Sequence, residues 1–119
     1  MKTHKDLLVW KRSIEFVTSI YKLTKDFPEE ERYGLSSQLR RAAISVSSNI
    51  AEGAARGSKK EFIRFLFVSR ASAVEIETQL IIAKNLGFLM SGDKLHLELE
   101  SISRMITGLI NKLKNDSKN

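Results

Sequence analysis

The sequence contains no cysteine, and it has only one proline and six glycines among its 119 residues. The absence of cysteine excludes a disulfide framework, thiol catalysis and cysteine-ligated zinc, and it suits a reducing compartment. No run approaches the roughly 18 apolar residues of a membrane-spanning helix. The opening MKTHKDLLVWKRS has charges on both sides of a short apolar patch, unlike a signal peptide. We therefore expect a soluble, cytoplasmic protein that does not contact a membrane.

Residue types that carry catalysis or bind metals are also scarce. There are two histidines, and no Glu-x-x-His motif of the kind that a di-iron bundle requires. Glu75 and Glu77 are two residues apart and point to different faces of a helix, so they make no acid/base pair. The segment EGAARGSKKE lacks the glycine spacing of a nucleotide-binding loop. We expect no enzymatic activity, no cofactor and no metal.

Apolar residues recur at three- and four-residue steps along most of the chain, which is typical of amphipathic helices. Four helices are predicted, near residues 5–26, 34–52, 58–86 and 91–114. Short connections force neighbouring helices to run antiparallel. The expected fold class is therefore all-α, an antiparallel up-down-up-down four-helix bundle, in a single domain over residues 1–119.

Several residues set the expected helix ends and faces. Ser58 and Glu61 form an S-x-x-E capping box at the start of the third helix. Gly53 and Gly87 are expected to cap the ends of the second and third helices. In the fourth helix the heptad spacing places Leu99, Ile102 and Ile106 in the core.

The first and third helices carry more apolar surface than a monomeric bundle needs. The stripe assigned to the core in the first helix is Leu7, Trp10, Ile14, Val17 and Tyr21. Its additional stripe is Val9, Phe16, Ile20, Leu23 and Phe27. The additional stripe of the third helix is Ile63, Phe67, Val74 and Ile81. Such stripes would exceed the apolar patch of an ordinary monomer, so they predict subunit contacts in a homo-oligomer, with an unusually wide core as the alternative.

Positive charge is concentrated in the middle of the chain. Residues 40–70 hold seven cations and two anions, which supply five of the six net positive charges. Such an excess attracts polyanions, although a solvated helix surface is the alternative. The candidate phosphate contacts are Arg40, Arg41, Arg56, Lys59, Lys60 and Arg64. Helix geometry separates the first two from the Arg56 group by roughly 25 to 30 Å.

A polar stretch, SVSSNIAEG, ends the second predicted helix. Because Glu52 near a helix C-terminus is unfavourable with the helix dipole, it needs a cation such as Arg56 or Arg70. We interpret Asn49 and Glu52 as a structural polar clamp that fixes the turn into the third helix. The alternative is a phosphate site formed by that turn and the amides of the third helix.

Most of the chain resembles the 23S rRNA intervening-sequence protein family. The similarity covers DLLVWKRSIEFVTSIYKLT, the run from FPEEERYGL to KKEFIRFL, SAVEIETQL and LGFL. Its most specific part is QLRRAAISVSSNIAEG, where Gln38, Arg40, Arg41, Asn49, Glu52 and Gly53 match the family's motif. The resemblance implies a small antiparallel bundle that assembles into a homopentamer. It assigns no catalytic residues.

The same family is similar to accessory variability proteins of diversity-generating retroelements, which bind nucleic acid. Two functions are therefore expected from the sequence. The first is a non-enzymatic oligomeric accessory protein that binds RNA or DNA through its basic residues. The second is a protein–protein interaction scaffold with a protein partner and no nucleic-acid binding. Because the aromatic residues are mostly assigned to apolar stripes, any nucleic-acid binding should be directed at the backbone.

Overall fold

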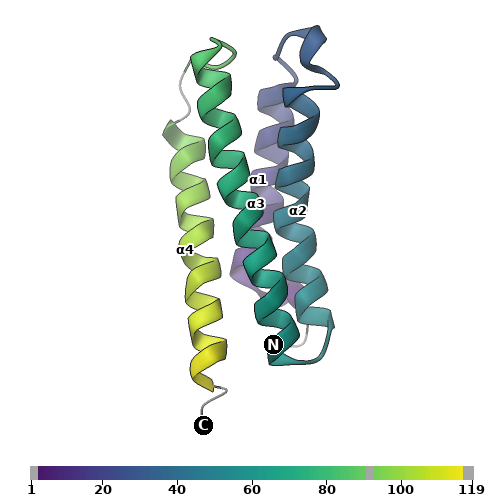
Figure 1. Cartoon of the computed structure of the whole chain (residues 1–119), viewed down its shortest axis with the longest axis vertical. Helices are drawn as coiled ribbons and strands as arrows, with labels where there is room; N and C mark the ends of the chain where they lie inside the picture. Colours follow the sequence, from purple (N-terminus) through teal and green to yellow (C-terminus); the bar gives the residue numbers. More distant parts are fainter. Residues whose placement is uncertain (1–2, 91–92, 117–119) are drawn as a thin grey trace.

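The computed structural model describes residues 3–90 and 93–116, and within these ranges every long element is an α-helix. The helices are α1 (Leu8–Thr24), α2 (Leu35–Ala55), α3 (Lys59–Asn85) and α4 (Asp93–Asp116). Short 3-10 turns, η1 (His4–Asp6) and η2 (Glu29–Glu31), precede α1 and α2. Successive helices run in opposite directions along a body of 51 × 21 × 19 Å (Figure 1). The predicted all-α four-helix bundle is confirmed.

Each helix packs against its neighbours in the sequence, and α4 also packs against α1. The core is formed by apolar side chains of all four helices, among them Ile20, Leu39, Ile50, Leu66 and Ile106, each fully buried. No helix in the described ranges is long and apolar enough to cross a lipid bilayer.

The core face of α1 differs from the prediction. Val9, Phe16 and Ile20, assigned above to the additional stripe, are 4%, 2% and 0% exposed, whereas Ile14 and Tyr21 are both 41% exposed. Both stripes have helical spacing, so periodicity within one helix could not decide between them. Buried Ser13 and Thr24 complete the true core face, and their hydroxyls donate to main-chain carbonyls of α1 at 2.7 and 2.8 Å. An apolar pattern does not detect such residues.

The helix ends follow the sequence signals in part. Ser58 accepts a hydrogen bond from the Glu61 amide at 3.1 Å, which is one half of the predicted capping box, whereas the Glu61 carboxylate accepts from Arg64. Gly87 ends α3 with a φ of +79°, and the amide of Phe88 donates to the carbonyl of Ala83 at 2.9 Å, which is the expected cap. Gly53 is not a cap, because α2 continues through it to Ala55.

The core face of α4 and most of the outward stripe of α3 agree with the prediction. Leu99, Ile102 and Ile106 of α4 are buried. Phe67, Val74 and Ile81 of α3 are 38%, 60% and 47% exposed on this single chain. Three of the four residues predicted for the outward stripe of α3 are therefore exposed, whereas Ile63 is half-buried against the core. The outward stripe of α1 is formed by residues such as Ile14 and Tyr21.

Candidate nucleic-acid interface

The consecutive arginines of α2 point in different directions. Successive helical residues are rotated by about 100°, so Arg40 and Arg41 cannot share a face. The Nε of Arg40 donates to Thr24 Oγ1 of α1 at 2.8 Å, and its guanidinium lies 4.4 Å from the centre of the Tyr21 ring. Arg41 faces the other way and lines an open groove between α2 and α3 with Ser72. The two arginines therefore serve different surfaces.

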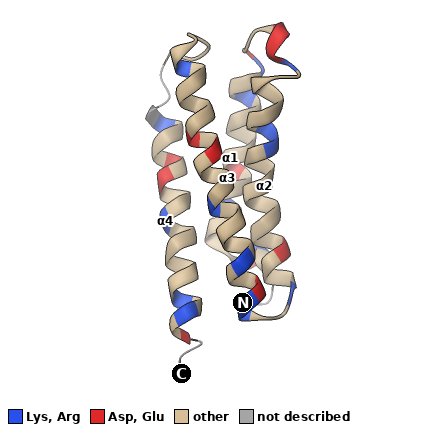
Figure 2. Ribbon diagram, in the orientation of Figure 1, with Lys and Arg blue, Asp and Glu red and all other residues tan. Residues whose placement is uncertain are grey.

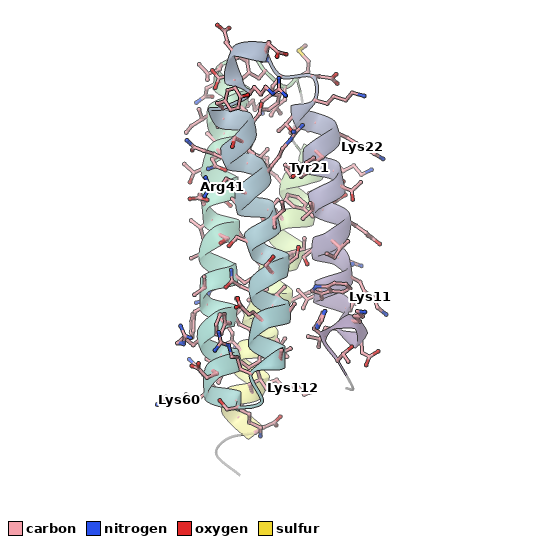
Figure 3. All side chains as sticks on the ribbon, turned by 90° about the vertical axis from the view of Figure 1, so that its right-hand side faces the viewer. Lys11, Tyr21, Lys22, Arg41, Lys60 and Lys112 are labelled. Atoms are coloured by element: carbon pink, nitrogen blue, oxygen red, sulfur yellow. The ribbon has the colours of Figure 1, made fainter. Side chains whose placement is uncertain are left out.

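The remaining predicted cations gather where α2 turns into α3. Figure 3 places Lys60 at this end of the bundle with Lys112 of α4, and it places Arg41 far from both. Figure 2 shows the same distribution, with the acidic η2 turn at the opposite end. We call this region the basic end, and it comprises Arg56, Lys59, Lys60, Arg64, Lys112 and Lys114. The predicted separation from Arg40 and Arg41 along the bundle agrees with this arrangement.

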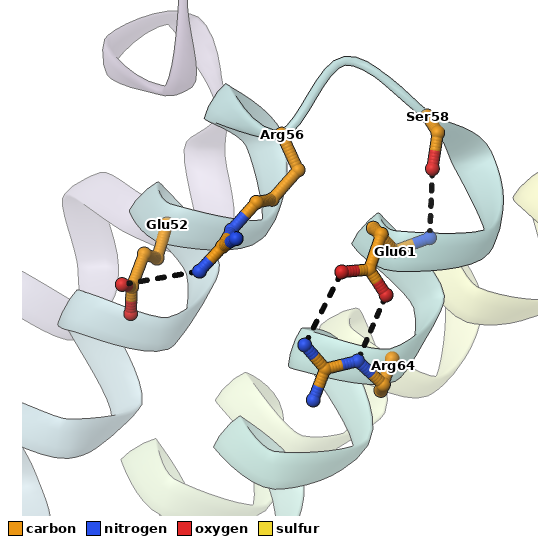
Figure 4. Close-up of polar contacts among 5 residues, drawn as sticks. All are labelled: Glu52, Arg56, Ser58, Glu61 and Arg64. Atoms are coloured by element: carbon orange, nitrogen blue, oxygen red, sulfur yellow. Dashed lines mark hydrogen bonds and ion pairs between the residues drawn. The ribbon is translucent and has the colours of Figure 1, made fainter.

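Two arginines of the basic end have acidic partners within their own helical turns. Arg56 lies 3.6 Å from Glu52, and Arg64 donates to both carboxylate oxygens of Glu61 at 2.8 and 3.2 Å (Figure 4). Both guanidinium groups also lie over the Phe65 ring, 4.8 and 4.5 Å from its centre. These contacts orient the arginines around a buried ring and leave their outer edges in solvent.

Lys59 and Lys60 differ from these arginines because both are exposed and form no ion pair with any described residue. They lie in the first turn of α3, directly after the Ser58 cap. Their charges are therefore free to contact an external anion.

The titration of Glu61 reports the local positive potential. Its pKa lies below the usual range, chiefly because Arg64 donates a hydrogen bond to the carboxylate, and the charges of Arg64, Arg56 and Lys60 lower it further. Partial desolvation opposes this shift. These cations therefore stabilise the negative charge that Glu61 itself carries.

The polar stretch that ends α2 acts differently from the predicted clamp. The Glu52–Arg56 ion pair is present. Asn49, however, donates to the carbonyl and hydroxyl of Ser45 at 2.8 and 3.0 Å, one turn back along α2, so its amide is directed away from the turn. Ser45 in turn lies 2.9 Å from the hydroxyl of Ser72 in α3. Asn49 therefore holds Ser45, and Ser45 makes the contact between α2 and α3.

Known proteins share this arrangement of helices. The family model described as 23S rRNA-intervening sequence protein matches residues 5–108. The chain belongs to this family. A solved structure from Bacteroides thetaiotaomicron, described as a protein with unknown function from the S23 ribosomal protein family, superposes with a TM-score of 0.81. It is 23% identical and covers 87% of this chain and 96% of its own, which supports the fold alone. No curated protein sequence matches the chain.

The sequence did not predict that the α4 cations Lys112 and Lys114 belong to the basic end of this family member. Lys114 lies 5.1 Å from the centre of the Phe67 ring, and Arg70 lies 4.8 Å from it. Arg70 also donates to Thr107 of α4 at 3.0 Å, so it is not the partner of Glu52 that the sequence allowed. Residues 112–114 are remote from residues 56–64 in the sequence, and only the antiparallel order of α3 and α4 could have indicated that they meet.

Among the described residues of this family member, no group of three or more histidine, aspartate or glutamate side chains could hold a metal ion. His96 is half-buried in the first turns of α4.

Proposed function

We propose that this member of the 23S rRNA-intervening sequence family is a non-enzymatic accessory protein that assembles as a homo-oligomer, a pentamer as the family resemblance implies, and binds RNA or DNA through its basic end. The observation that carries the proposal is the gathering of six cations at one end of the bundle, where the helices contribute the acids Glu52, Glu61 and Asp116 and the η1 turn adds Asp6. An excess of cations on a rigid surface binds phosphates and releases counterions.

Binding at the basic end should be directed at phosphates rather than bases. The nearby Phe65 ring is 8% exposed and lies against Arg56 and Arg64, so it offers no open face for base stacking. Phosphate contacts carry no sequence information by themselves. We therefore expect the protein to bind many sequences with similar affinity.

Assembly would multiply these contacts. The exposed stripe Phe67, Val74 and Ile81 on α3, together with Ile14 and Tyr21 on α1, supplies apolar surface for neighbouring copies. In a ring, neighbouring subunits make heterologous contacts, so the stripe on α3 need not meet its own equivalent. Repeating the basic end around one rigid body would let several weak phosphate contacts reinforce one another.

Replacing the free lysines tests the proposed surface. Lys59→Ala with Lys60→Ala should weaken binding to structured RNA and to duplex DNA alike and should leave the oligomer mass unchanged, because both side chains are exposed and outside the core. The matched control is Lys22→Ala with Lys94→Ala, which removes the same charge from exposed positions outside the basic end. Fluorescence anisotropy measures both variants. Equal losses in the two variants would show that net charge, and not the basic end, determines binding.

A protein-interaction scaffold is the second candidate function. It is favoured by Tyr33 and Met90, which are 88% and 95% exposed and lie in the connections after α1 and after α3. Exposed large side chains of this kind are common in protein interfaces. If the wild-type oligomer binds no nucleic acid at low salt, this candidate replaces the first.

A further inference from the structure

A second cationic site lies at the corner where α1 ends and α2 begins, away from the basic end. It is an open pocket of about 190 Å³ lined in part by Thr24, Lys25, Glu29, Arg32, Ser36 and Arg40. Three of these side chains are cations and one is an anion, so the lining has a formal charge of +2. The volume equals that of about six water molecules, which is enough for one phosphate group.

Arg40 is held in place before any ligand arrives. Its Nε donates to Thr24 Oγ1 at 2.8 Å, and the Thr24 hydroxyl donates to the carbonyl of Ile20 at 2.8 Å. Thr24 is 4% exposed, so this anchor is rigid. The Nη2 of Arg40 also donates to the carbonyl of Tyr21 at 3.5 Å, which leaves three of the five guanidinium N–H groups for an anion.

Ser36 supplies an independent indication of a ligand. It is 5% exposed and lines the pocket, yet its hydroxyl makes no hydrogen bond with any described residue. Two other side-chain oxygens, those of Ser47 and Gln79, lack a partner because they are sealed from water, and the Ser36 hydroxyl is not one of them. The Ser36 hydroxyl is therefore open to the pocket and unpaired, although the rest of the residue is buried.

The backbone adds a favourable field. Ser36 lies in the first turn of α2, a helix of 21 residues with no side-chain bond from its N-cap, Gly34. Glu31 accepts from the amide of Leu35 at 3.1 Å, but the amides of Ser36 and Ser37 have no partner among the described residues. Free amides at a helix N-terminus bind anions, and Ser36 lines the pocket, although the Glu31 carboxylate already occupies part of this terminus.

We propose that this corner pocket binds a dianionic phosphate group, either free or at the end of a phosphate monoester. A monoester carries close to two negative charges near neutral pH, which matches the charge of the lining. A terminal phosphate can enter a pocket end-on, whereas a backbone diester is substituted on two sides. The site is distinct from the basic end and does not depend on it.

The first test follows the backbone amides of Ser36 and Ser37 by NMR during titration of the full-length protein with inorganic phosphate, against sodium chloride at matched ionic strength. Phosphate should cause saturable shifts of these amides, and chloride should not. Identical responses to the two salts would overturn the proposal.

A pair of variants tests the role of the side chains. Arg32→Gln should weaken phosphate binding by about tenfold, because it removes a charge-assisted contact. Arg32 is exposed and its ion pair is with Glu29 of the same turn, so the fold should survive its replacement, which the amide spectrum also reports. The control Lys22→Gln removes the same charge from an exposed position outside the pocket and should change the affinity less than twofold. Equal losses in both variants would contradict the site.

A third measurement identifies the source of the phosphate. Two single-stranded oligonucleotides of one sequence, with a 5′-phosphate or a 5′-hydroxyl, are compared in shifting the Ser36 amide. A shift with the 5′-phosphate alone assigns the pocket to strand ends, whereas a shift with inorganic phosphate or a nucleoside 5′-monophosphate alone assigns it to small phosphates. If phosphate saturates the pocket and no nucleic acid binds the basic end, the proposed function fails while this inference stands. If nucleic acid binds the basic end and phosphate does not bind the pocket, only this inference is contradicted.

Discussion

At Gly53, α2 and α3 approach so closely that no side chain fits between them. A Cβ atom placed on Gly53 would lie 2.7 Å from Cβ of Phe65 and 3.3 Å from the carbonyl oxygen of Phe62. Both are fixed by the backbone of α3, so neither can move aside cheaply. Gly53 therefore allows α2 and α3 to approach closely. The sequence alone had indicated that this glycine ends the helix.

Replacing Gly53 with alanine should destabilise the protein. Alanine gains about 1 kcal/mol of helix propensity, but overpacking in a core costs about 1 to 3 kcal/mol, and contact with Cβ of Phe65 favours the upper part of that range. We expect a net loss of about 1 to 2 kcal/mol in urea unfolding. Gly108→Ala in α4 is the control, because a Cβ atom placed there would meet no atom within 4 Å, and it should stabilise by up to about 1 kcal/mol. A stabilised Gly53→Ala protein would contradict this packing.

The Glu61–Arg64 pair predicts a pH dependence. The pKa of Glu61 is lowered in the folded protein, so the pair stabilises the fold above the pKa that Glu61 has in the unfolded chain. This contribution is lost as the pH falls through the lowered pKa. Carboxyl NMR titration should show the Glu61 pKa rising towards its usual value in Arg64→Gln. An unchanged pKa in this variant would show that Arg64 does not cause the shift.

At the scale of elements, periodicity and cap residues predicted all four helices and the exposed stripe of α3. They assigned the wrong face of α1 to the core, because Ser13 and Thr24 complete that face and satisfy their own hydroxyls. They also predicted too early a start for the first helix, because the extended backbone of Leu7 separates η1 from α1. Which face is buried depends on the position of the other helices, and one helix alone does not contain that information.

The outward stripe of α3 predicts the effect of a charge within it. Val74 is 60% exposed, so Val74→Glu should leave the folded subunit intact. If the stripe is a contact between subunits, the carboxylate would be buried without a partner, and the oligomer should dissociate. Light scattering at micromolar concentration measures the mass, with Ser48→Glu at an exposed site on α2 as the control. A wild-type protein with the mass of a monomer would contradict assembly.

At the scale of the whole molecule, the two ends of the bundle carry different charge. The end at η2 holds three consecutive glutamates beside Lys25, Arg32 and Arg40 of the corner pocket, whereas the opposite end holds the six cations of the basic end (Figure 2). The sequence located the cations of residues 56–64 in this site but could not join Lys112 and Lys114 to them, because those contacts depend on the antiparallel order of α3 and α4. It also grouped Arg40 with Arg41, which the turn of one helix separates.

The measurement that tests the central claim most directly is the salt dependence of binding of the wild-type oligomer to RNA and duplex DNA of unrelated sequences. We predict similar affinities at about 50 mM salt and a steep linear fall of log K with log salt, by about 0.9 per phosphate contact on duplex DNA. Lys59→Ala with Lys60→Ala should make that slope shallower by up to about 1.8. No binding to any nucleic acid at about 50 mM salt, where the electrostatic attraction is strong, would contradict the proposed function.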